Sequence, residues 1–104
     1  MIIEKAEFKD LEEILCLQKL AYLSEAEIYD DYSIPPLVQT LDSIREDFKN
    51  QLILKATSEG KIIGSVRALK KETTCYIGRL IVHPAHQNKG IGAQLIKCIE
   101  SHFG

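Results

Sequence analysis

The chain has 104 residues, a formal net charge of -2, and 45% hydrophobic and 27% charged residues. This length and composition predict one globular domain, residues 1–104, and the slight acidity argues against nucleic acid as a partner. No apolar run is long enough to span a bilayer, and residues 1–5 lack the pattern of a secretory signal, so we expect a cytoplasmic protein without membrane association.

The first part of the chain predicts a short strand followed by two helices. Residues 1–6 form the strand, and apolar residues then recur at helical spacing over residues 10–22, where Asp10 and Glu13 are placed to form a capping box. Residues 24–39, with Pro35 next to Pro36, predict a functional loop with short helical pieces. A second helix is expected over residues 40–49, with Thr40 or Asp42 as its cap.

The second part of the chain predicts three strands and a last helix. Residues 52–57 and 62–69 pair as an antiparallel hairpin around a tight turn at residues 59–61. Residues 75–82, from Cys75 to Val82, are almost continuously apolar, which favours a position deep in the sheet. The final helix spans residues 90–103. The order β-α-α-β-β-β-α predicts an α/β (α+β) fold.

The cysteines do not indicate a site. Their number is odd, no C-x-x-C spacing occurs, and each lies in an apolar helix or strand pattern: Cys16, Cys75 and Cys98. We expect buried free thiols rather than a disulfide, a nucleophile or a metal site, and no metal is predicted.

The junction between the last predicted strand and the last predicted helix carries the strongest functional signal. It reads Gln87-Asn88-Lys89-Gly90-Ile91-Gly92. Glycines let the backbone approach an anion closely, and the first amides of the following helix have no partners within that helix. Lys89 adds a positive charge. The junction is therefore suited to a pyrophosphate, although the Rossmann and P-loop strings do not occur.

The string Q-x-x-G-x-G, preceded by Leu80, Val82 and Pro84, resembles the acetyl-CoA-binding signature of the GNAT superfamily of N-acetyltransferases. The resemblance covers essentially the whole chain and implies a mixed, mainly antiparallel sheet flanked by helices. It implies acetyl-CoA as the acetyl donor. The cofactor-binding residues that it implies act mainly through backbone amides: Leu80, Ile81, Val82, Gln87, Asn88, Lys89, Gly90, Ile91, Gly92 and Ala93.

The resemblance also implies the reaction. A primary amine attacks the acetyl thioester directly, so no enzyme nucleophile is needed, and a bulge near Leu80 to Val82 presents amides to the cofactor. The acceptor pocket is implied to involve Tyr22, Glu25, Glu27 and Tyr29; a solvated loop is the alternative. No catalytic residue is assigned.

Four other polar residues have two interpretations each. Arg67 and Arg79 lie inside predicted strands, where they either face the cleft or serve a structural role, which we favour. His83 and His86 flank Pro84 near the glycine loop, and solvent-facing loop residues are the favoured interpretation over a catalytic base.

The chain ends soon after the pyrophosphate helix, where GNAT proteins continue with the other wall of the cleft. We therefore expect the cofactor-binding half of the fold, with residues 75–82 at a sheet edge that a homodimer partner covers. The leading hypothesis is an N-acetyltransferase. The alternatives are a non-catalytic acyl-CoA-binding or interaction module, an inactive fragment, or a structural α/β domain with an empty loop.

Overall fold

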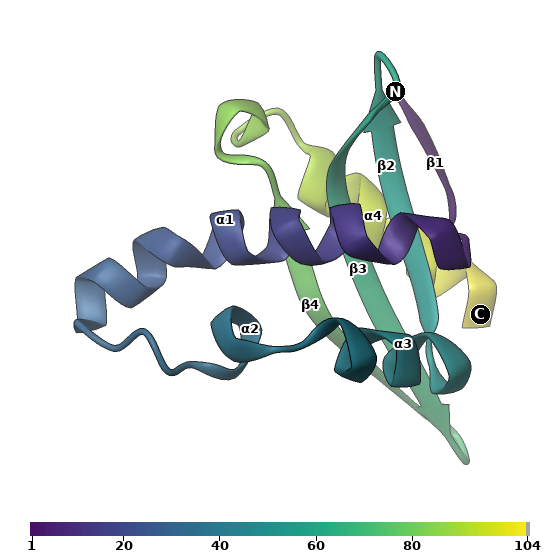
Figure 1. Ribbon diagram of the computed structural model, residues 1–104. Helices are drawn as coiled ribbons and strands as arrows, with labels where there is room; N and C mark the ends of the chain where they lie inside the picture. Colours follow the sequence, from purple (N-terminus) through teal and green to yellow (C-terminus); the bar gives the residue numbers. More distant parts are fainter. Residues whose placement is uncertain (104) are drawn as a thin grey trace.

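The structure is a computed structural model that describes residues 1–103. Its centre is an antiparallel four-stranded sheet with the strand order β1-β2-β3-β4 (Figure 1). The strands are β1 (Ile2–Lys5), β2 (Leu52–Ser58), β3 (Lys61–Lys71) and β4 (Thr74–Val82). This mixed α/β arrangement confirms the fold class expected from the sequence.

Helices cover both faces of the sheet (Figure 1). On one face lie α1 and α3; on the other lies α4. The helices are η1 (Phe8–Asp10), α1 (Leu11–Tyr29), α2 (Pro35–Val38), α3 (Leu41–Asn50), η2 (Pro84–His86) and α4 (Ile91–Phe103), where η marks a 3-10 helix. Within residues 1–103, none of these helices is both long and apolar enough to cross a membrane.

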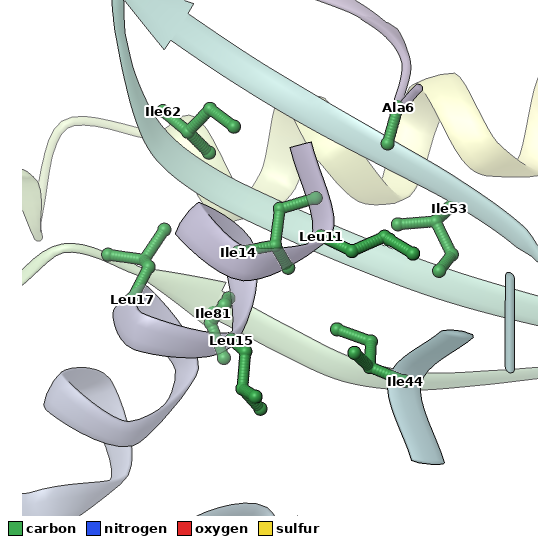
Figure 2. Close-up of a cluster of buried hydrophobic side chains, with 9 residues drawn as sticks. All are labelled: Ala6, Leu11, Ile14, Leu15, Leu17, Ile44, Ile53, Ile62 and Ile81. Carbon is green, nitrogen blue, oxygen red and sulfur yellow. The ribbon is translucent and has the colours of Figure 1, made fainter. Parts of the chain in front are cut away.

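The face of the sheet under α1 carries one hydrophobic cluster. Side chains from α1, α3, three strands and the residue after β1 converge there, as Figure 2 shows: Ala6, Leu11, Ile14, Leu15, Leu17, Ile44, Ile53, Ile62 and Ile81. Ile14 and Ile44 are completely buried. Burial of such side chains is the main contribution that fixes α1 and α3 against the sheet.

The opposite face packs against α4 through a second cluster. Leu95 and Ile99 are completely buried against β2 and β3. Gly64 allows this close approach, because a Cβ at Gly64 would lie 3.1 Å from Leu95 Cδ1 and 3.2 Å from the Ile81 carbonyl oxygen. The packing of α4 on β3 fixes where the N-terminus of α4 lies relative to the end of β4.

The hairpin and the second long helix agree with the sequence predictions. Glu59 and Gly60 have φ values of 51° and 79°, the conformation of the mirror-image turn that suits a tight hairpin. Thr40 caps α3 by accepting a hydrogen bond from the Ser43 N–H at 3.1 Å. Of the two predicted caps, Thr40 is therefore the correct one.

The predicted capping box at the start of the first helix is wrong. Asp10 instead accepts the Glu7 N–H at 2.8 Å and closes η1, and its carboxylate also bonds Lys55 Nζ at 2.7 Å. The Glu13 carboxylate accepts the Ile62 N–H at 2.8 Å. Both acids therefore join the helical layer to the sheet, through partners on β2 and β3.

The first helix is also longer than predicted. It continues through residues 24–29, which the sequence interpretation assigned to a loop, and ends at Tyr29 with Asp30 in the left-handed conformation. Glu25, Ala26 and Glu27 favour a helix, and the first proline comes only at residue 35. The last turns of α1 extend past the edge formed by β4 (Figure 1).

Two predictions about burial are wrong. Cys16 is exposed, and Cys75 and Cys98 are only half-buried, although all three are free thiols. The strand β4 is largely exposed and lies at the edge of the sheet. This agrees with the edge position expected from the GNAT resemblance and not with the deep position expected from the apolar run. A run of apolar residues marks a strand but does not distinguish a central strand from an edge whose outer side is open.

Candidate functional site

A bulge interrupts β4 shortly before its end. The pairing with β3 shifts between Ser65 and Arg67, so that Ser65 faces Ile81 whereas Arg67 faces Gly78. Two residues of β4, Arg79 and Leu80, therefore lie opposite the single residue Val66 of β3. Arg79 has a φ of 50°, in the left-handed region. A bulge of this kind turns backbone groups out of the ladder. The sequence placed the bulge at residues 80–82; in the structure it begins one residue earlier.

Beyond the bulge, the backbone of Val82 faces the open side of the sheet. The His83 N–H donates to the Ile63 carbonyl at 2.8 Å, which places the backbone groups of residue 83 toward β3. Successive residues of a strand direct their amides to opposite sides, so the N–H and C=O of Val82 point away from β3. The Gln87 Nε2 atom lies 3.5 Å from the Val82 carbonyl oxygen, which agrees with this direction.

The loop after β4 carries the two left-handed residues that bring the chain to the start of α4. Asn88 has a φ of 65° and Gly90 a φ of 78°. Asparagine and glycine are the residues that adopt this conformation most readily. The Gln94 N–H donates to the Gly90 carbonyl at 3.1 Å, so the amides of Ile91, Gly92 and Ala93 precede the first helical hydrogen bond.

The bulge and the loop enclose a cavity of about 360 Å³, which we call the β4–α4 cavity. Its lining residues are Leu80, Val82, His86, Gln87, Asn88, Gly90, Ile91 and Gly92. Gly92 forms part of the wall, because a Cβ there would already lie 3.7 Å from Leu80 Cδ2. The cavity thus meets an open strand edge on one side and the positive end of the α4 dipole on the other.

Most of the cofactor residues implied by the sequence line this cavity, and three do not. Ile81 directs its side chain into the core beneath α1 (Figure 2), where it is 3% exposed. Lys89 and Ala93 are exposed beside the cavity. His86, which the sequence interpretation favoured as a solvent-facing residue, is half-buried and lines the wall.

His83 has a structural role at the end of β4. Its Nδ1 accepts the Ala85 N–H at 3.0 Å and so caps η2, while its ring lies 5.8 Å from the His86 ring, edge to face. The ring of His83 is therefore held by the backbone of η2 rather than directed at an open reactive position.

A buried polar network lies on the opposite side of β4, beneath α1 and α3. Arg67 is 2% exposed and donates to Gln39 Oε1 at 3.1 Å, to Asp47 Oδ2 at 3.0 Å and to Gln18 Oε1. Gln18 also donates to the Pro36 carbonyl and to Gln39, both at 2.9 Å. The network joins α1, α3 and β3 to the residues around α2. Most of the N–H donors of Arg67 are used within it, which supports a structural role for this residue.

Burial lowers the pKa of Arg67 to about 10; the Asp47 carboxylate opposes this shift, and the nearby Arg79 adds to it. The sequence interpretation missed Gln18, Gln39 and Asp47. A signal was present for Gln18 alone, because it occupies an apolar-face position of α1 where a polar residue needs a partner.

The residues implied for the acceptor pocket lie on the second half of α1. Tyr22 is half-buried and packs against the cluster beneath α1, whereas Glu25, Glu27 and Tyr29 are exposed on the last turns of α1. None of the four lines the β4–α4 cavity. In residues 1–103, no three histidine, cysteine, aspartate or glutamate side chains gather in a way that would hold a metal ion.

The sequence profile of the Acetyltransferase (GNAT) family matches residues 9–103. The chain belongs to this family. Among curated proteins, the UPF0157 protein YqkA of Bacillus subtilis (strain 168) is 33% identical over 90 residues, which are 86% of this chain and 26% of that protein. The chain thus spans about a quarter of the length of that relative.

Solved structures of GNAT proteins share the fold. A GNAT family acetyltransferase from Brucella melitensis in complex with acetyl-CoA has a TM-score of 0.81 and 25% identity, covering 98% of this chain and 67% of that chain. The PaiA N-acetyltransferase of Thermoplasma acidophilum in complex with coenzyme A has a TM-score of 0.75 and 20% identity, covering 99% of this chain and 72% of that chain. The GNAT resemblance read from the glycine loop is confirmed.

Proposed function

We propose that this chain is the acetyl-CoA-binding part of an N-acetyltransferase, which transfers an acetyl group to a primary amine. The observation that carries the proposal is the β4–α4 cavity, in which free helix amides and an open strand edge face one space. Membership of the GNAT family and the acetyl-CoA complex of the Brucella melitensis relative support it.

The pyrophosphate of the cofactor is proposed to bind at the start of α4. The amides of Ile91, Gly92 and Ala93 donate to it, with the dipole of α4 adding partial positive charge. Gln87, Asn88 and Gly90 shape the loop, and Lys89 supplies a charge at its rim. These groups bind an anion without a metal ion.

The acyl-pantetheine arm is proposed to run along the open edge at residues 80–82. The outward N–H and C=O of Val82 pair with the amides of the arm, and Leu80 packs against it; Ile81 holds the strand in place through its buried side chain. A backbone amide at the bulge polarises the thioester carbonyl and stabilises the oxyanion.

The proposed chemistry is one acyl transfer. The amine nitrogen attacks the acetyl carbon and forms the C–N bond; the C–S bond then breaks, and the proton lost by the amine balances the one taken up by the coenzyme A thiolate. Positioning supplies much of the rate. No residue of the chain is assigned as the base or the acid.

The test is a screen for acetyl transfer by the 104-residue chain. Acetyl-CoA is incubated with polyamines, aminoglycosides, amino acids and peptide amines, and products heavier by one acetyl group are sought by mass spectrometry. Transfer of an acetyl group to any of these acceptors supports the proposal that the chain acts as an N-acetyltransferase. Cofactor binding without transfer to any acceptor class would instead support the alternative, a non-catalytic acyl-CoA-binding module.

A homodimer that covers the first part of the β4 edge, residues 74–78, is also proposed, because residues 80–82 are needed for the acyl-pantetheine arm. Tyr76 and Ile77 in this part of β4 are 57% and 39% exposed, and an unpaired apolar edge favours pairing with another chain. Sedimentation equilibrium is expected to give a dimer, and Ile77→Lys a monomer. A monomeric wild-type chain at micromolar concentration would contradict the dimer.

A cytoplasmic location is also proposed. The three cysteines are all free thiols, which is usual for proteins of a reducing compartment.

A further inference from the structure

A second cavity, of about 320 Å³, lies on the side of β4 that faces α3. We call it the Arg67 cavity, and the residues that matter for its chemistry are Asp47, Gln51, Arg67, Tyr76, Gly78 and Arg79. Its volume is at the small end of the range for small-molecule sites, which begins at roughly 300 Å³.

Two guanidinium groups in this cavity have buried nitrogens without partners. The Nε atoms of Arg67 and Arg79 are both inaccessible and make no hydrogen bond within residues 1–103. Three of the four other N–H groups of Arg67 donate to Gln18, Gln39 and Asp47. Because buried polar groups in proteins almost always have a partner, each orphaned N–H indicates an acceptor that binds there.

The charges of the cavity define the class of that acceptor. Arg67 and Arg79 bring two positive charges, and the Asp47 carboxylate, 3.0 Å from Arg67 Nη1, brings one negative charge. The two cations are close enough that Arg79 lowers the pKa of Arg67. A group with a single negative charge balances the site, whereas a doubly charged phosphate would meet repulsion from Asp47.

The position of the cavity relates it to the proposed acyl-transfer site. Gly78 and Arg79 line the Arg67 cavity, and the next residue, Leu80, lines the β4–α4 cavity. Neighbouring residues of a strand are separated by only about 3.3 Å. A small molecule can therefore hold an anionic group against the arginines while its amine reaches the bulge of β4.

We propose that the Arg67 cavity binds the carboxylate of the acetyl acceptor, so that the acceptor is an amino carboxylate rather than a simple amine. The carboxylate accepts from the guanidinium groups of Arg67 and Arg79, and a rotation of these side chains on binding brings their buried Nε–H donors to it; a planar anion with two oxygens satisfies this arrangement. The role as an acceptor site rests on the proposed acetyl transfer; the binding of a carboxylate does not.

The test compares two ligands that differ only in the carboxylate. 4-Aminobutyrate and n-butylamine are titrated into the chain labelled with nitrogen-15, and amide shifts of residues 76–79 are followed by NMR. We expect 4-aminobutyrate to bind at least about tenfold more tightly, a factor equivalent to about 1.4 kcal/mol. Equal affinities would overturn the proposal, and so would inorganic phosphate that binds more tightly than 4-aminobutyrate.

Arg79→Gln is the decisive variant, because it removes one cation and its Nε–H while leaving the Gln18–Gln39–Asp47 network intact. The preference for 4-aminobutyrate should disappear in Arg79→Gln and persist in Arg45→Gln, which removes a surface arginine of α3 outside the cavity. A preference that survives in Arg79→Gln would overturn the proposal. Circular dichroism of both variants checks that the fold is retained.

A parallel titration with acetyl-CoA separates the two proposals. Binding of 4-aminobutyrate without binding of acetyl-CoA would uphold the carboxylate site and remove its role as an acceptor site. Binding of acetyl-CoA without the carboxylate preference would overturn this inference and leave the proposed acetyl transfer in place.

Discussion

The Arg67 guanidinium in the middle of β3 lies 3.0 Å from the Asp47 carboxylate of α3. The side chain of Arg67 is 2% exposed and that of Asp47 is 28% exposed. This ion pair joins α3 to the sheet. Among the side chains in residues 1–103 that accept hydrogen bonds from Arg67, only Asp47 carries a charge. The stability of the face beneath α1 and α3 therefore depends on a contact between residues that are far apart in the sequence.

Asp47→Ala is expected to destabilise the fold by about 3 kcal/mol, because it leaves a buried arginine without its counter-charge. Urea unfolding followed by circular dichroism measures the change. Asp42→Ala is the matched control: Asp42 pairs with Arg45 at 3.6 Å on the surface, and its loss should cost less than about 1 kcal/mol. Equal losses for the two variants would show that the Arg67 network contributes little.

The ion pair between Asp10 and Lys55 predicts a dependence of stability on pH. Burial opposes ionisation of Asp10, but hydrogen bonds from Lys55 and the Glu7 N–H and the charge of Lys55 outweigh it, so its pKa falls below 3.8. The hydrogen bond to Asp10 likewise raises the pKa of Lys55 above 10.5, against the effect of burial. The ion pair therefore contributes its full stabilisation at pH values between 3.8 and 10.5, the ordinary pKa values of the two groups. This stabilisation is lost as the pH falls through the folded-state pKa of Asp10 or rises through that of Lys55.

Lys55→Met tests this ion pair. At pH 7 the variant should be less stable by about 2 kcal/mol, because an ionised and nearly buried Asp10 loses its partner. At pH 3 the deficit should shrink, because Asp10 can take up a proton in the variant. Lys49→Met, at a surface pair 3.5 Å from Glu46, controls for the loss of a lysine. A deficit that is the same at both pH values would contradict the assignment.

Gly64→Ala tests the packing that places α4. The new methyl group would lie within 3.2 Å of the Ile81 carbonyl oxygen, which cannot move without distorting β4, so we expect a loss of about 1–3 kcal/mol. Gly78→Ala is the control, because the space around that position on β4 is open. Gly78→Ala should be neutral or stabilising by up to about 1 kcal/mol. Thermal unfolding of the two variants gives the comparison.

Local signals in the sequence were sufficient to predict most helices and strands and the glycine loop. Turn chemistry at Glu59 and Gly60 marked the hairpin, the cap at Thr40 marked α3, and Gly90 with Gly92 marked the strand-to-helix junction. Each of these features depends on residues within a few positions of one another. For that reason a pattern in the sequence carries them.

Features that depend on distant partners could not be predicted in the same way. Asp10 does not cap α1 but pairs with Lys55, which is 45 positions away in the sequence. The Nε of Arg67 has no partner within residues 1–103, whereas Gln18, Gln39 and Asp47 accept from its other nitrogens. The exposure of Cys16 follows from which side of α1 faces the sheet. Such contacts are set by packing, which sequence spacing does not determine.

The central claim is that the start of α4 binds the pyrophosphate of acetyl-CoA. Isothermal titration of acetyl-CoA into the wild-type chain, Gly90→Asp and Gly60→Asp tests it most directly. The two glycines have nearly equal φ values, 78° and 79°, and open space around them, so the variants carry the same strain and charge at different places. We predict saturable binding to the wild type and to Gly60→Asp, and at least about tenfold weaker binding to Gly90→Asp. No binding to the wild type, or equal binding to all three, would contradict the claim.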